Sequence, residues 1–254
     1  MPIKSPLINV MQTSIMKVSR RLLRDFGEIE NIQLSHEKID KFVSNSLSYV
    51  IYNLKDNLQH SRTDWGIAHE NESLEKDKFY WLLEPINGLE NFKRGIPIFA
   101  IAIAVVKNDE ILASAIFDPT RDQFFFAEKG KGAFVNDRRI RVSNRVELKS
   151  GLISIEEQFE VPIIEKIKSV NINPFQNIRS FYCSALSFCW LSSGKIDCFI
   201  GNNVSYPVLK SGELLLTEAG GFISQKSNNK STLIISANPK IHKIISKFYR
   251  QNQS

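Results

Sequence analysis

The sequence has few cysteines and no long hydrophobic run. Its three cysteines are an odd number and include no CxxC pair, which argues against a disulfide framework and favours three buried thiols. No spacing of cysteine and histidine matches a zinc site. The longest uncharged apolar run, 96–106, is shorter than the roughly 20 residues that span a bilayer. The first residues contain no apolar signal core. We therefore expect a cytoplasmic protein with no membrane partner.

The chain also contains no internal repeat, no low-complexity stretch and no block of like charges. Lysine and arginine number 33 against 27 aspartates and glutamates, for a net charge of +6. This excess is compatible with an anionic partner such as nucleic acid. Because it is spread along the chain, we interpret it as an ordinary solvated surface. We interpret Lys240, Lys243, Lys247 and Arg250, which form one stripe on the expected last helix, in the same way.

The first half of the sequence predicts two helices followed by a β-meander. Apolar residues at three- and four-residue spacing favour helices over 6–26 and 41–58. Alternating apolar residues between turn signals favour strands, and a short helix follows Asn87-Gly88. The expected strands are 66–69, 79–83, 98–106, 111–117 and 124–127, with the short helix at 89–93.

In the second half, short strands alternate with helices, which is typical of a layered α/β (α+β) architecture. The expected strands are 152–155, 178–181, 198–200 and 233–236; the expected helices are 161–170, 185–193, 210–219 and the segment after Pro239. We expect a division into 1–146 and 147–254, with the two halves packed as one compact unit.

One segment carries a family resemblance. Trp81-Leu82-Leu83-Glu84-Pro85-Ile86-Asn87-Gly88-Leu89-Glu90-Asn91-Phe92 resembles the W-x-x-D-P-[IL]-D-G-T-x-N-F signature of the inositol monophosphatase family, closest to its bacterial SuhB-like branch. The segments 95–101, 128–136 and 218–221 match the family in register. The resemblance covers nearly the whole chain. It implies a layered αβαβα sandwich of the sugar-phosphatase type, usually a homodimer, and Mg²⁺-dependent hydrolysis of inositol 1-phosphate and related phosphate monoesters.

The positions that bind metal in the family have mostly changed. Glu70 matches the first metal ligand, but its companion is Asn71. Glu84 replaces the bridging aspartate and adds a methylene, which displaces the carboxylate by much more than the tolerance of Mg²⁺–oxygen bonds. Asn87 replaces the second aspartate, and the main-chain carbonyl of Ile86 is a further family ligand. These four residues, Glu70, Glu84, Ile86 and Asn87, are the candidate metal site.

The positions that perform catalysis in the family have also lost their polar groups. The threonine that positions the attacking water is Leu89, its aspartate partner is Leu47, and the last metal-binding aspartate is Val208. The resemblance further implies that Tyr182-Cys183 replaces a Gly-Thr pair beside the substrate, so that the tyrosine fills the pocket, and that Gly201 replaces an inositol-binding glutamate. No catalytic residue is therefore assigned.

A second kind of site remains at the start of the short helix. The backbone N–H groups of Asn87, Gly88 and Leu89 offer donors to a phosphate or sulfate without metal, although an ordinary solvated helix start explains them equally well.

Two functions follow. In the first, the chain is a degenerate phosphatase homologue retained as a binding scaffold. The SuhB resemblance then implies a partner in the transcription machinery or an RNA. In the second, it is a weak or altered Mg²⁺-dependent phosphatase that uses Glu70, Glu84 and Asn87. A metal site rebuilt from Glu72, Glu75 or Glu90 also stays open.

Overall fold

The structure is a computed structural model that describes residues 4–32, 36–68, 74–108, 110–156, 177–227 and 232–251. Two long helices come first, α1 (Pro6–Ile32) and α2 (His36–Ser61). The remaining helices are short: α3 (Leu89–Lys93), α5 (Ser184–Ser192), α6 (Tyr206–Glu218), α7 (Pro239–Gln251) and a single 3₁₀ turn at Leu148–Ser150. In the part of the chain described, no helix is both long and apolar enough to cross a membrane.

The first sheet is a seven-stranded meander in the order β1-β2-β3-β4-β5-β6-β7. Its strands are β1 (Gly66–Ala68), β2 (Phe79–Asn87), β3 (Ala100–Lys107), β4 (Glu110–Asp118), β5 (Gln123–Glu128), β6 (Gly132–Val135) and β7 (Arg138–Arg139). Only β1 and β2 pair in parallel; every later neighbour is antiparallel. The antiparallel meander predicted from the alternating apolar residues is therefore confirmed.

The second sheet has five strands in the order β11-β12-β10-β8-β9. Its strands are β8 (Leu152–Ile155), β9 (Asn177–Arg179), β10 (Cys198–Asn202), β11 (Phe222–Ser227) and β12 (Thr232–Ala237). Because β8 runs parallel to both β9 and β10, the carboxyl ends of three strands lie at one edge of this sheet.

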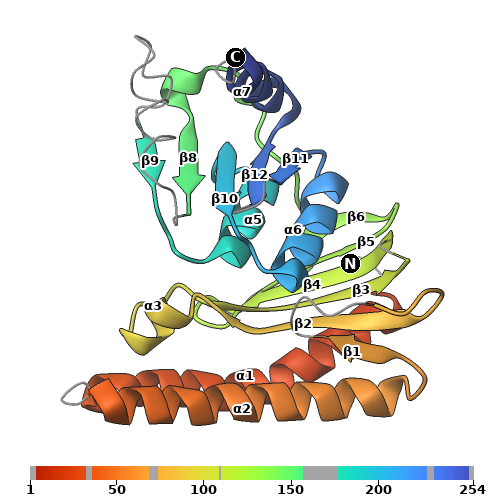
Figure 1. The fold of residues 1–254 in the computed structure, drawn as a ribbon, viewed down its shortest axis with the longest axis vertical. Coiled ribbons are helices and arrows are strands. Elements are labelled where there is room, and N and C mark those ends of the chain that lie inside the picture. Colours follow the sequence, from red (N-terminus) through yellow and green to blue (C-terminus); the bar gives the residue numbers. More distant parts are fainter. Residues whose placement is uncertain are drawn as a thin grey trace.

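The elements stack as alternating helical and sheet layers, as predicted (Figure 1). Helices α1 and α2 cover one face of the first sheet, α5 and α6 lie between the two sheets, and α7 packs on β11 and β12. In the meander, Ile101 and Phe117 face α1 and α2, whereas Ala102 and Ile116 face α5 and α6. Because successive side chains of a strand point to opposite faces, apolar residues of the same strands cover both faces of the sheet.

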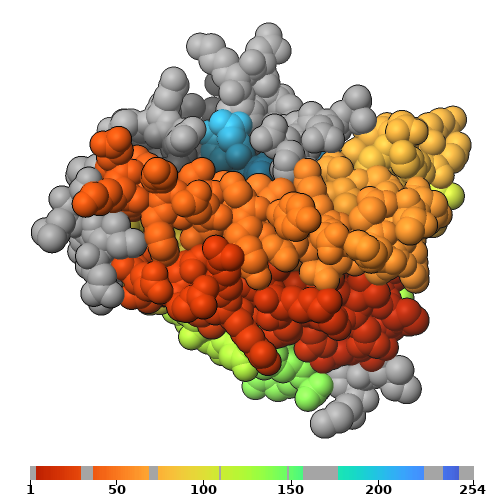
Figure 2. Space-filling view, turned by 90° about the horizontal axis from the view of Figure 1, so that it is seen from below, coloured from red at the N-terminus to blue at the C-terminus, as the bar shows by residue number. Residues whose placement is uncertain are grey.

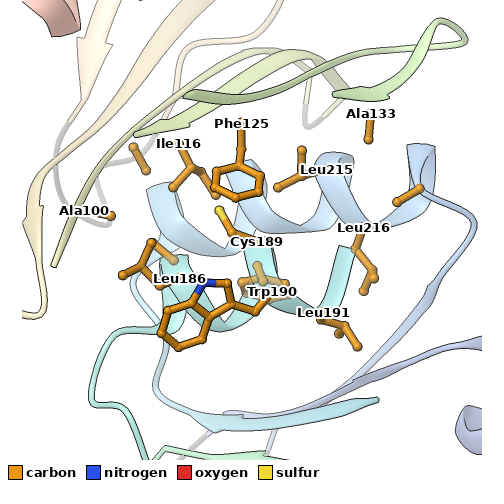
Figure 3. Packing of buried hydrophobic residues seen from close by; sticks show 14 of the residues in the cluster. Ala100, Ile116, Phe125, Ala133, Leu186, Cys189, Trp190, Leu191, Leu215 and Leu216 are labelled. Carbon is orange, nitrogen blue, oxygen red and sulfur yellow. The ribbon is translucent and has the colours of Figure 1, made fainter. Parts of the chain in front are cut away.

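Helix α5, in the middle helical layer, is buried on all sides. Every residue of α5 is buried, because the helix touches both sheets and α6. Figure 3 shows Leu186, Cys189 and Trp190 of α5 packed against Phe125 and Leu215. The three cysteines are free and buried, as predicted.

Several element boundaries differ from the prediction. Strand β2 continues to Asn87, beyond its expected end at residue 83, and α6 begins at Tyr206, four residues before its expected start at 210. Strands β6, β7 and β11 were not predicted, because their short runs lack clear alternation. On α7, Ile241 is buried but Ile244 is 42% exposed. The helix predicted over 161–170 lies outside the described residues, and the division near residue 146 stays a prediction.

Candidate functional site

The signature residues lie where β2 ends against the first turns of α5 and α6. The pairing of β2 with β3 shifts register between Glu84 and Asn87, so the strand bulges at this point. Gly88 follows with a φ of 88°, and a Cβ there would lie 2.6 Å from the carbonyl oxygen of Ile98. Only glycine fits this turn without strain.

Glu84 joins β2 to the start of α6. Its Oε2 accepts a hydrogen bond of 2.5 Å from the hydroxyl of Ser205, the residue that precedes α6. Burial raises the pKa of the Glu84 carboxyl, and the Ser205 hydrogen bond opposes this only in part. A carboxyl group binds Mg²⁺ in its ionised form, so the burial of Glu84 works against metal binding.

Asn87 joins β2 to the start of α5. Its Oδ1 accepts a hydrogen bond of 2.9 Å from the backbone N–H of Ala185. Its main-chain oxygen accepts one of 3.4 Å from the Cys183 thiol. The amide oxygen that would bind a cation therefore already has a donor, and it satisfies an N–H group that the helix itself leaves open.

The three family positions predicted to lack catalytic groups are packed as apolar residues. Leu47 and Leu89 contact the cluster beneath the first sheet. Val208 is fully buried in the cluster between the two sheets. None of these side chains offers a ligand or a hydrogen bond to water.

The structure describes only some of the other carboxylates considered from the sequence. Glu70 and Glu72 lie outside the described residues. Glu75 is exposed and pairs with Lys78 at 3.0 Å, and Glu90 is exposed and pairs with Lys93 at 3.2 Å. Among the described residues there is no group of three or more His, Cys, Asp or Glu that could hold a metal. Glu84 is the one charged donor at the end of β2 beside Asn87, whereas Mg²⁺ prefers several charged oxygens. Because Glu70 lies outside the described residues, the metal site at Glu70, Glu84, Ile86 and Asn87 stays a prediction.

A buried carboxyl beside this site was missed in the sequence. Glu156 follows β8 and accepts hydrogen bonds from the Cys183 N–H at 2.9 Å and the Ser187 hydroxyl at 3.0 Å, and also from Ser184. Burial raises its pKa to about 7, against the opposing effect of these donors. Its position directly after a predicted strand could have indicated it, because polar groups at the carboxyl ends of parallel strands commonly line ligand-binding sites.

The signature residue Asn91 keeps the loops around the site together. Its buried amide group donates to the carbonyl oxygens of Ile98 and Phe181, each at 2.8 Å. Tyr182, which follows Phe181 in the chain, has a φ of 53° and is 52% exposed. Its backbone therefore lies in the left-handed region, which favours glycine. Its half-exposed side chain does not fill an enclosed pocket as predicted.

The predicted anion site at Asn87, Gly88 and Leu89 begins a helix of five residues, and Gly88 provides no side-chain cap. The side chain of Asn87 faces α5, so only backbone N–H groups remain for an anion. This site stays a prediction.

Comparisons with known proteins give the same family. The family model described as the inositol monophosphatase family matches residues 5–253. An inositol-1-monophosphatase of Mesorhizobium japonicum is 31% identical over 238 residues, 91% of this chain and 89% of the relative. The Nus factor SuhB of Xylella fastidiosa is 27% identical over 87% of this chain and 82% of the relative. The crystal structure of the extragenic suppressor protein suhB from Bartonella henselae superposes with a TM-score of 0.82 at 30% identity, over 97% of this chain and 100% of that one.

The sequence match over almost the entire chain, the shared layers and the shared signature lead to one conclusion: this chain belongs to the inositol monophosphatase family.

Proposed function

We propose that this chain is a non-catalytic member of its family, in which the fold is retained as a binding scaffold. The observation that carries the proposal is the use of two polar side chains of the signature, Glu84 and Asn87. They bond to Ser205 and to the first turn of α5, and they tie three elements together directly.

The remaining positions add to this support. Val208 is in the core, and Leu89 cannot orient water. Loss of one catalytic group commonly lowers a rate by roughly 10²–10⁴. Several such losses together would leave little phosphatase activity.

A partner in the transcription machinery is the binding function we propose. It rests on the relatives named Nus factor SuhB in Xylella fastidiosa and putative Nus factor SuhB in Neisseria meningitidis. We also propose that the chain acts in the cytoplasm as a homodimer, as implied by the family.

The second candidate is a weak Mg²⁺-dependent phosphatase built on Glu70, Glu84 and Asn87. It is favoured by the relatives named inositol-1-monophosphatase. It requires an ionised Glu84 carboxylate. It also requires that the Asn87 amide oxygen bind the metal in place of the Ala185 N–H group.

Phosphate release from inositol 1-phosphate across a Mg²⁺ titration separates the two candidates. We expect no turnover above the blank by the native chain. A matched variant restores the family residues through Asn71→Glu, Glu84→Asp, Asn87→Asp, Leu89→Thr and Val208→Asp. A second variant with only Glu84→Asp and Asn87→Asp avoids a charge in the core.

We expect Mg²⁺ binding, measured by calorimetry, to appear in a restored variant and to be absent from the native chain. Mg²⁺-dependent turnover by the native chain would overturn the scaffold proposal.

A further inference from the structure

The outer face of the α1–α2 layer carries a cluster of cations that the signature site does not use. Lys17, Arg20, Arg21 and Arg24, here the α1 cationic stripe, are all exposed. Their spacing of three and four residues places them on one side of α1, over about 10 Å of helix. No acidic residue lies between Lys17 and Arg24 in the sequence. Figure 2 views this face, where α1 (red) and α2 (orange) lie side by side.

The charges of the stripe are poorly neutralised by their neighbours. Lys17 donates to the neutral amide oxygen of Asn57 at 2.8 Å. Arg21 and Arg24 share one carboxylate, Asp25, at the long distances of 3.7 and 4.0 Å. That carboxylate is buried and also accepts a hydrogen bond of 2.8 Å from Ser46. In the described residues Arg20 has no ion pair, so the stripe keeps a net positive charge.

Two tyrosines of α2 border the stripe. The Arg21 guanidinium lies 4.0 Å from the centre of the Tyr49 ring, which holds it flat and leaves its N–H edges available. Tyr52 lies one turn further on the same side of α2 and is 71% exposed. Tyr49 is partly buried and packs against the cluster beneath the first sheet, so Tyr52 is the ring that is available to a base. Cations that contact phosphates and aromatic rings on which bases stack are the two features shared by proteins that bind single strands without sequence preference.

We propose that the α1 cationic stripe binds the phosphates of a single-stranded nucleic acid, while the exposed ring of Tyr52 stacks on one of its bases. The stripe lies on the opposite side of the first sheet from Glu84 and Asn87, which face α5 and α6. The proposal therefore does not depend on whether the signature site retains activity. An acidic peptide would use the charges but would leave the exposed ring of Tyr52 unexplained.

The test is fluorescence anisotropy of the full chain with a labelled oligouridylate of about 20 nucleotides, repeated with the matching oligothymidylate, over a range of salt concentrations. We expect saturable binding that weakens with salt. The double variant Arg20→Gln/Arg24→Gln should raise Kd about 10-fold or more. It should also lower the slope of log K against log salt by roughly 1.4, since each lost single-strand phosphate contact removes about 0.7.

A matched control removes the same charge from exposed positions of α7 through Lys240→Gln/Lys243→Gln, and should change Kd less than about 2-fold. Tyr52→Ala should raise Kd roughly 5-fold or more through lost stacking. All substituted side chains are exposed, and unchanged thermal unfolding will confirm that each variant folds.

Three results would each overturn the proposal: absence of saturable binding at low salt, an equal loss in the α7 control, or competition by polyglutamate as effective as that by the oligonucleotide. Tighter binding of the oligouridylate or of the oligothymidylate would show whether the stripe prefers RNA or DNA.

Discussion

Glu156 places a carboxyl group beneath the first turn of α5, where three donors converge on it. Donors favour the ionised form, but burial opposes it more strongly and raises the pKa to about 7 from an ordinary value of 4.5. The folded state therefore holds a proton that the unfolded state releases between these two values. Stability from this group is complete below about pH 4.5 and is lost as the pH rises to about 7.

We therefore predict that Glu156→Gln removes a pH dependence. Between pH 4.5 and 7, the free energy of unfolding of the native chain should fall relative to the variant by up to about 3 kcal/mol. Urea unfolding at several pH values measures this difference. Glu147→Gln, at an exposed carboxylate, is the control and should leave the slope unchanged. Parallel slopes for the native chain and Glu156→Gln would contradict the prediction.

At the scale of elements, two glycines within helices differ in the space that surrounds them. A Cβ at Gly212 in α6 would lie 2.2 Å from the ring of Phe188 in α5, whereas a Cβ at Gly27 in α1 would meet nothing within 4 Å. The first glycine permits α5 and α6 to approach closely between the two sheets. The second only weakens its helix.

We predict that Gly212→Ala destabilises the fold by about 1–3 kcal/mol, because the ring of Phe188 is enclosed and cannot move away. Gly27→Ala is the matched control, and it should stabilise the fold by about 0.5–1 kcal/mol through helix propensity. Chemical denaturation of both variants checks the pair. A neutral Gly212→Ala would show that α5 and α6 can separate without cost.

For the whole molecule, the hydrogen bonds of Glu84 and Asn87 link the first sheet to the middle helical layer. A fold held together in this way does not require a cation at the same place. Under the proposed function, Mg²⁺ should therefore leave the melting temperature unchanged.

Thermal unfolding with and without Mg²⁺ measures this, with NaCl of equal ionic strength as the control. A specific site filled at 100 times its Kd would add about 2.7 kcal/mol, a rise of roughly 5–10 °C for a chain of this size. A rise of that size would favour the second candidate, a weak Mg²⁺-dependent phosphatase.

The layered architecture and most of the elements could be predicted from the amino-acid sequence. Apolar spacing located α1, α2 and the meander, because the period of buried residues follows directly from helix and strand geometry. The substitutions at 47, 89 and 208 were also readable, since a leucine or valine cannot bind metal in any conformation.

The contacts of the remaining polar residues could be found only in the folded structure. The partners of Glu84, Asn87 and Glu156 lie 121, 98 and 27 to 31 residues away in the chain, so no local pattern could reveal them. The same holds for Gly212 and Phe188, and for the half-exposed side chain of Tyr182. Charge, burial and hydrogen bonding at these residues depend on elements brought together by the fold, and a linear sequence does not specify their distances.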